Sequence, residues 1–166
     1  YAKIAHNHDF MTSRVTRAMI HAHLEHGVHI AAENPRGGME RQWFMNAPAW
    51  KAITEKQVVD YCAFRHPYKK PENIWVSEFG WSPTGITGDG RCGDKCESGS
   101  FRTDTGRFRH DKVLSGATGT GPTGSGIEQQ KNAVPPMLLD EILSAVKSQR
   151  TDSRRTWVID LFAGYG

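Results

Sequence analysis

Hydrophobic positions near the start of the chain recur with the period of an α-helix. Thr12 and Ser13 offer helix N-caps and Gly27 offers a stop, so the pattern predicts a helix over residues 12–25. We expect one face of this helix to pack on a core. The positions of that face, at the i, i+3, i+4, i+7 spacing, are Val15, Ala18, Met19 and Ala22.

A short apolar run, VHIAA at residues 28–32, follows this helix. It is bounded by Gly27 and Pro35, and its length and composition suit a buried strand better than a second helix. Glu33 and Asn34 then fall at the carboxyl end of the predicted strand. Because open α/β sheets bind ligands beyond the carboxyl ends of their strands, this pair is a candidate site.

The middle of the chain changes from strand-like to irregular. The runs QVVDYC (57–62) and NIWVS (73–77) are separated by the prolines of HPYKKP, which exclude a helix and predict a hairpin or a crossover pair. From about residue 80 to 126, Gly, Thr, Ser, Asp and Arg predominate, with turn signals such as SPTG and GPTGSG. This composition predicts a long irregular lobe.

The last third contains a second helix and a final strand. PPMLLDEILSAVKSQ (135–149) begins with two prolines and carries an apolar stripe, which predicts a helix. The polar segment TDSRR (151–155) then leads to WVIDL (157–161), an apolar strand that passes into the glycine turn FAGYG. The pattern as a whole predicts an α/β fold.

Composition narrows the class of protein. The chain has 166 residues, enough for one domain with a sizeable core. A net charge of +3, a mean hydropathy of -0.58 and a pI of 8.8 fit a soluble protein and permit nucleic-acid binding without requiring it. The three cysteines, an odd number, do not indicate a framework of paired disulfides. No apolar run approaches the ~20 residues that span a bilayer, and the first residues do not resemble a signal peptide. We therefore expect an intracellular protein, nuclear or cytoplasmic, that does not enter a membrane.

Three segments taken together resemble the DNA cytosine-5 methyltransferase family, especially its small virus- and phage-type members. IAAENPRG (30–37) is similar to the Glu-Asn-Val segment of that family. QQKNAVPPMLLDEIL (129–143) resembles its last conserved block, and VIDLFAGYG (158–166) resembles its first. Between them, CAFRHPYKKPENIWVS (62–77) is similar to the family's proline-and-basic strand pair, with Lys70 about where an Arg is usual.

The resemblance implies a fold and a domain arrangement. It implies an incomplete S-adenosylmethionine-dependent methyltransferase (Rossmann-like) fold with a Gly-rich irregular lobe. Residues 1–147 would form a partial catalytic domain that includes the lobe at 80–126, where the family reads its target sequence. Residues 148–156 would be a linker, and 157–166 the cofactor-binding strand and turn. The family's first block comes last here, so we expect a circular permutation, a tandem of two domains or a cut from a longer gene.

The resemblance also implies catalytic roles. Methylating cytosine at C5 needs a nucleophile at C6 and a group beside N3, with the base outside the duplex stack. Glu33 matches the family's glutamate, and burial would raise its pKa so that it could donate a proton to N3. Asn34 is expected to fix the turn; the alternative for Glu33 is an ordinary carboxylate that caps a turn before Pro35. The chain contains no Pro-Cys nucleophile, which the resemblance places shortly before Tyr1, so this chain alone is expected not to methylate DNA.

S-adenosylmethionine is the cofactor that the resemblance implies. Asp160 ends the last strand, and Gly164 and Gly166 would let the backbone approach the methionine end of the cofactor. Phe162 would pack on its adenine or ribose. Asn132 would add a polar contact, with a plain loop before the helix as the alternative.

DNA is the expected partner, with a solvated basic face as the alternative. The basic and aromatic side chains expected to contact phosphates include Arg65, Tyr68, Lys69, Lys70, Arg107 and Arg109, together with His66 and Arg102.

No metal site is expected. Zinc could be held by Cys92, Cys96 and the downstream His110. A structural zinc site needs four ligands at tighter spacing than Cys-x3-Cys alone gives, so free thiols are favoured. In HAHLEHGVH, His21 and His26 lie five residues apart, whereas the helical metalloprotease pattern needs four.

Two other functions compete with cytosine methylation. One is a nucleic-acid-binding protein without catalysis, in which the basic lobe acts and the methyltransferase segments are relics. The other, methylation of adenine amino groups, is disfavoured because Glu-Asn-Pro departs from the Asp/Asn-Pro-Pro-aromatic signature of that chemistry.

Overall fold

A computed structural model describes most of the chain. Its backbone covers residues 2–35, 43–110, 133–149 and 157–161. Its side chains cover residues 13–34, 43–110 and 133–149.

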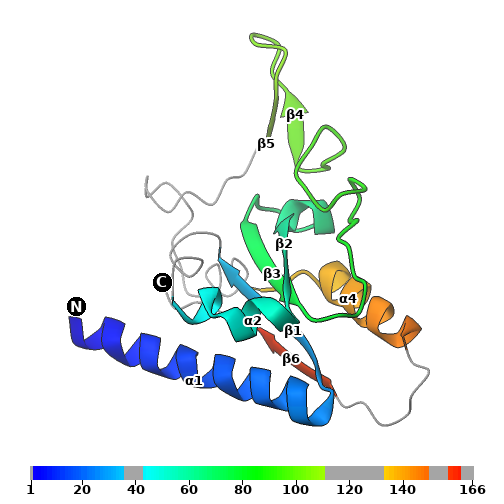
Figure 1. Cartoon of the computed structure of the whole chain (residues 1–166). Helices are drawn as coiled ribbons and strands as arrows, with labels where there is room; N and C mark the ends of the chain where they lie inside the picture. The colour runs from blue at the N-terminus through cyan, green and yellow to red at the C-terminus, as the bar shows by residue number, and fades with distance from the viewer. Residues whose placement is uncertain (1, 36–42, 111–132, 150–156, 162–166) are drawn as a thin grey trace.

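A mixed sheet of four strands forms the centre of the molecule, in the order β2-β3-β1-β6 (Figure 1). Three strands are antiparallel neighbours: β2 (Glu55–Asp60), β3 (Pro71–Val76) and β1 (His29–Pro35). On the other edge of β1, β6 (Trp157–Leu161) runs parallel to it. The α/β class is therefore confirmed.

One face of the sheet is covered by helices from the first third of the chain. These are α1 (Ala2–His26), the short 3-10 helix η2 (Phe44–Asn46) and α2 (Pro48–Ile53). Two tryptophans are buried there, Trp50 at 1% and Trp75 at 5% exposure. The buried cluster on this face comprises Met19, Ile30, Ala32, Phe44, Met45, Trp50, Ile53 and Trp75.

The opposite face carries α4 (Pro136–Ser148) and the 3-10 helix η3 (Tyr61–Phe64). The apolar stripe of α4 is buried through Leu138, Ile142 and Val146. Burial of each such side chain contributes roughly 1.5–3 kcal/mol, so packing on the sheet is what holds this helix. These side chains form one cluster with residues of β1, β2, β3 and η3.

A small hairpin stands apart from these layers. β4 (Gly99–Phe101) and β5 (Phe108–His110) pair antiparallel and project from the body as an arm (Figure 1). Phe101 packs edge-on against Phe108, yet Phe101 is 61% exposed. We call residues 99–110 the arm.

Several predicted boundaries need correction. The first helix begins at Ala2 rather than at residue 12, and Ala18 on its predicted core face is exposed. The strand at 57–62 ends at Asp60, where the chain turns into η3. The lobe at 80–126 contains the arm, and its part beyond residue 110 lies outside the described residues. η2 and α2 were not predicted.

Other predicted elements agree with the structure. The runs at 57–62 and 73–77 form an adjacent antiparallel pair, as β2 and β3. The helix predicted at 135–149 is α4, and the strand predicted at 157–161 is β6 with the same bounds. The linker at 148–156 lies almost wholly outside the described residues.

Candidate functional site

Glu33 lies inside β1 rather than beyond its end, which corrects the prediction. The strand continues to Pro35 because Glu33 and Asn34 stay in register with Ile74 and Asn73 of β3. Successive side chains alternate between the faces of a sheet, so Glu33 shares the α4 face with Ala31. Glu33 is 4% exposed, a depth at which a carboxyl group needs a partner or a proton.

Glu33 belongs to a polar cluster within this apolar face. Glu72 pairs with Pro35 in the β1–β3 ladder and is therefore the diagonal neighbour of Glu33 on the same face. Lys70 Nζ lies 2.8 Å from Glu72 Oε1 and 5.0 Å from the centre of the Tyr61 ring. We call Glu33, Tyr61, Lys70 and Glu72 the carboxyl cluster.

Burial changes the ionisation of this cluster. The pKa of Glu33 is raised to about 8, mainly by desolvation and also by the charge and hydrogen bonding of Glu72, against smaller opposing effects of Lys70 and Tyr61. Desolvation and the two carboxyl groups also raise the pKa of Tyr61. At neutral pH the cluster therefore holds a proton on Glu33 and a neutral phenol beside it.

This protonation state gives Glu33 a specific chemical capacity. A neutral carboxyl can donate a hydrogen bond to a ring nitrogen and accept one from an amino group, whereas a carboxylate only accepts. Glu33 Oε1 is buried without a hydrogen-bond partner among the described residues.

Asn34 has a different place from the one predicted. It lies in the ladder of β1 opposite Asn73 and so does not fix a turn. Strand alternation puts it on the helix α1 and α2 face, away from Glu33. Asn34 is 4% exposed and is a buried structural residue rather than a neighbour of the carboxyl group.

The strand of the predicted cofactor segment adjoins β1. Asp160 pairs with Ala32, and Leu161 pairs with Glu33, in parallel register. Parallel neighbours end at the same edge of a sheet, so the chain leaving β6 starts beside Glu33. The remaining predicted cofactor residues, Phe162, Gly164, Gly166 and Asn132, lie outside the described residues.

The predicted DNA-contacting residues separate into buried and exposed groups. Lys70 needs correction: its side chain is 16% exposed and is paired with Glu72, so it neutralises the carboxyl cluster instead of facing solvent. Tyr68 and Lys69 are half-buried, and the side chain of Arg65 is 67% exposed, 3.8 Å from Glu97.

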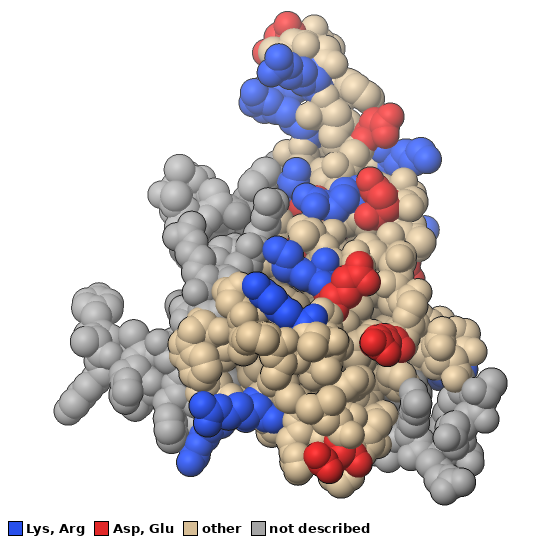
Figure 2. Space-filling model, in the orientation of Figure 1, with Lys and Arg blue, Asp and Glu red and all other residues tan. Residues whose placement is uncertain are grey.

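The exposed cations gather on the arm. Figure 2 shows Lys and Arg surfaces at the projecting end of the molecule, with a few acidic groups among them. Arg102, Arg107 and Arg109 are all exposed there. The arm therefore offers an exposed cationic surface made of three predicted DNA-contacting residues.

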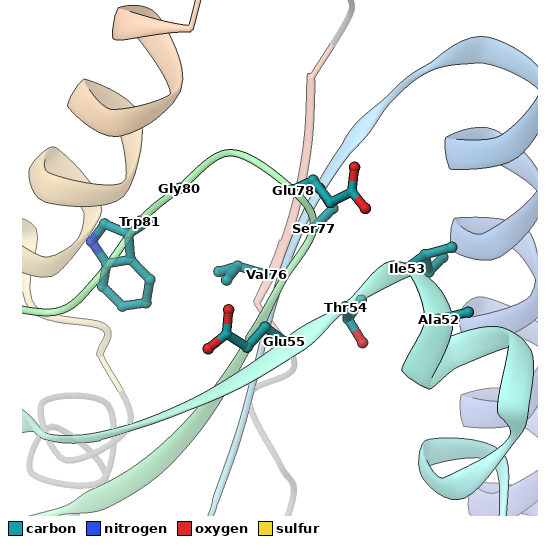
Figure 3. Close-up of a pocket in the computed structure, with 9 residues that line it drawn as sticks. All are labelled: Ala52, Ile53, Thr54, Glu55, Val76, Ser77, Glu78, Gly80 and Trp81. Carbon is teal, nitrogen blue, oxygen red and sulfur yellow. The ribbon is translucent and has the colours of Figure 1, made fainter.

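A cavity opens where β2 begins and β3 ends, with a volume of about 220 Å³. Glu33, which is level with the middle of these two strands, is not among the residues that line it. Figure 3 shows Glu55, Val76 and Trp81 around it. The lining residues are Ala52, Ile53, Thr54, Glu55, Val76, Ser77, Glu78, Gly80 and Trp81.

Sequence reasoning missed two members of the carboxyl cluster. Glu72 was read as part of a strand-pair motif and Tyr61 as a strand residue, although Glu72 is fully buried. The alternation of side chains along β3 could have identified Glu72, because residues 72, 74 and 76 lie on the same face of the strand. A glutamate in phase with Ile74 and Val76 is a buried charge that needs a counter-ion.

No helix in the described part of the chain is long and apolar enough to cross a membrane. Comparisons with models of protein families, with curated proteins and with solved structures found no significant match to this chain.

Proposed function

We propose that the chain is part of a DNA cytosine-5 methyltransferase with S-adenosylmethionine as its methyl donor. In this proposal residues 1–147 are a partial catalytic domain, 157–166 are its cofactor-binding strand and turn, and the fold is an incomplete methyltransferase fold. The proposal rests on the sequence resemblance together with the geometry around Glu33.

The observation that carries the proposal is the position of a protonated carboxyl next to β6. Glu33 is buried, has a pKa raised to about 8, and pairs in register with Leu161, just before the glycine turn. A base held by Glu33 and a cofactor held by that turn would meet at one sheet edge. This is the arrangement that methyl transfer to a flipped base requires.

In the proposed mechanism, Glu33 binds the N3 and amino edge of a flipped cytosine. Its proton relieves the charge that develops on the ring when a thiolate adds at C6. S-adenosylmethionine would supply the electrophilic methyl group. Glu72, which is paired with Lys70, and Tyr61 would orient Glu33.

Methyl transfer tests this role of Glu33. A form of the protein that carries a Pro-Cys dipeptide upstream of Tyr1 is incubated with duplex DNA and methyl-labelled S-adenosylmethionine. We expect label in cytosine, and a loss of at least about 100-fold in the Glu33→Gln variant, because the amide cannot pass a proton to the ring.

Glu55→Gln is the matched control. Glu55 is an exposed glutamate on β2, which β3 separates from β1, and its variant should keep full activity. Full activity in Glu33→Gln would overturn the proposed role, and an absence of label in the Pro-Cys form that keeps Glu33 would overturn the function.

A nucleic-acid-binding protein without catalysis is the second candidate. The exposed Arg102, Arg107 and Arg109 on the arm favour it, because phosphate binding needs accessible cations and no reaction centre. Such a protein would bind duplex DNA with affinity that falls steeply with salt and would not bind S-adenosylmethionine.

A further inference from the structure

Two cysteines of the chain meet one histidine at the base of the arm, and the third cysteine lies beside those two. The sulfur atoms of Cys62 and Cys96 and a ring nitrogen of His110 all lie within 4.8 Å of one another. The thiol of Cys92 interacts with those of Cys62 and Cys96. We call Cys62, Cys92, Cys96 and His110 the thiol cluster.

The four side chains come from three separate parts of the fold. Cys62 lies on η3, Cys92 and Cys96 lie on the loop that leads to the arm, and His110 ends β5. Pairing of β4 with β5 sets His110 opposite Gly99, three residues after Cys96. The cluster is therefore assembled by tertiary structure, which is why a spacing rule applied to Cys92 and Cys96 did not reveal a fourth ligand.

Hydrogen bonds hold the loop in this position. Asp60 Oδ2 accepts from the backbone N–H of Cys92 and from Arg91 Nε, each at 3.0 Å. The backbone N–H of Asp60 in turn donates to Gly90 O at 2.9 Å. The turn around Cys96 is closed by its own N–H bonding to Gly93 O at 2.9 Å. The positions of Cys92 and Cys96 are thus fixed without any bond between the sulfur atoms.

Burial and spacing match a structural metal centre. Cys62 is 1% exposed and Cys96 is 3% exposed, while Cys92 and His110 are half-buried. A tetrahedral zinc ion with bonds of ~2.3 Å to sulfur and ~2.0 Å to nitrogen separates its ligand atoms by roughly 3.5–3.8 Å. For Cys62, Cys96 and His110 the observed limit of 4.8 Å requires a contraction of about one ångström. Cys92, whose thiol interacts with both of these sulfur atoms, would move in as the fourth ligand.

From this geometry we propose that Cys62, Cys92, Cys96 and His110 bind one Zn²⁺ ion as a Cys3His structural site. Three thiolates and an imidazole are ligands that favour zinc over the harder divalent cations. All four positions are taken by the protein, so the site is closed and structural rather than catalytic. This inference does not depend on the proposed methyltransferase function.

The arm is the part of the molecule that such an ion would stabilise. Its two strands have three residues each, and its aromatic pair is largely exposed, so it buries little apolar surface of its own. Small elements without a core are commonly held by a metal. Zinc would join both ends of the arm to η3 and so set the position of Arg102, Arg107 and Arg109.

Metal content of the whole chain tests the proposal. The protein is purified without a polyhistidine tag, incubated with Zn²⁺, freed of excess metal, and assayed by elemental analysis. We expect one zinc per chain, with all three thiols protected from alkylation until a chelator is added. Co²⁺ in place of zinc should give the intense visible absorption of a tetrahedral thiolate complex.

Variants distinguish this site from other histidines of the chain. Cys96→Ser and His110→Ala should each weaken zinc binding by more than about 100-fold. His26→Asn, which changes an exposed histidine on α1, should bind zinc as the unmodified chain does.

Three results would overturn the proposal. They are a chain that retains no zinc, three thiols that react equally with and without zinc, and zinc binding that is lost in His26→Asn but kept in Cys96→Ser. Because the first two are measured on the unmodified chain, the test holds even where a cysteine variant fails to fold.

Discussion

Two polar clusters meet at η3, and consecutive residues of that helix belong to different ones. Tyr61 contributes to the carboxyl cluster, and Cys62 to the thiol cluster. In the carboxyl cluster, the pairing register of β1 and β3 fixes Glu33 and Glu72 as neighbours on one face of the sheet. The thiol cluster is set by loops and by the arm.

The two clusters also differ in how their buried charges are compensated. In the carboxyl cluster the charges compensate one another, through a proton on Glu33 and the pairing of Lys70 with Glu72. In the thiol cluster the charge of Lys69 acts on Cys92 alone among the cluster's described pKa effects, and we infer that a metal ion supplies the further positive charge that three thiolates need. One cluster is completed by the fold and the other by a ligand.

Removing the cation of the carboxyl cluster should have the largest effect. Lys70→Met leaves Glu72, which is fully buried, without its counter-ion, and should lower the free energy of unfolding by about 3–5 kcal/mol. Lys69→Met, at the half-exposed neighbouring position, should change it by less than about 1 kcal/mol. Urea unfolding measures both, and similar small changes in the two variants would show that the pair does not compensate Glu72.

The pH dependence of stability should depend on Glu33. A pKa raised from 4.5 to about 8 means that the folded state keeps a proton that the unfolded state has lost. The free energy of unfolding should therefore fall as pH rises from about 4.5 to 8, by at most about 1.4 kcal/mol per pH unit from this group. Glu33→Gln should remove this contribution, whereas Glu55→Gln should keep it. Parallel curves for Glu33→Gln and the unmodified chain would refute the raised pKa.

A substitution in the loop beside η3 should affect only the thiol cluster. Gly85 has a φ of +55°, and a Cβ there would collide with the carbonyl of Ala63 on η3. Gly85→Ala should lower stability by about 1–3 kcal/mol and weaken zinc binding, but leave the pH slope due to Glu33 unchanged. Gly93→Ala, where a Cβ meets no atom within 4 Å, should change neither. A change in the pH slope for Gly85→Ala would show that the clusters are coupled.

The smallest effect is expected at the tip of the arm. Arg107→Ala should leave the free energy of unfolding within about 0.5 kcal/mol, because its side chain is exposed. It should reduce the slope of the logarithm of DNA affinity against the logarithm of salt concentration by about one, the amount expected for the loss of one phosphate contact. Lys51→Ala, an exposed cation on α2, is the control and should keep the full slope. An unchanged slope for Arg107→Ala would place the DNA contacts elsewhere.

Regular hydrophobic spacing allowed part of this fold to be predicted. The apolar stripe of α4 predicted a helix, and the apolar run of β6 predicted a strand, where the structure has them. The end of β1 was placed too early because Glu33 and Asn34 are polar, yet both remain in the ladder opposite Ile74 and Asn73. Buried polar residues inside a strand are where a hydrophobic pattern fails, and here they mark the site.

The candidate site was predictable only where it is local in sequence. Glu33 came from a short motif, but its partner Glu72 is joined to it through strand pairing across thirty-nine positions of the chain. Cys62 is likewise brought to Cys96 by tertiary contacts, and the short strands of the arm carry too few residues to show a period. Spacing rules assign ligands within one segment and cannot assign those that the fold brings together.

Calorimetric titration of S-adenosylmethionine into the chain tests the central claim most directly, since the methyltransferase proposal requires a cofactor site beside Glu33. We predict saturable binding of one equivalent, lost in Gly164→Val and kept in Gly93→Ala. A chain that binds duplex DNA but releases no heat with S-adenosylmethionine would contradict the proposal and favour the non-catalytic alternative.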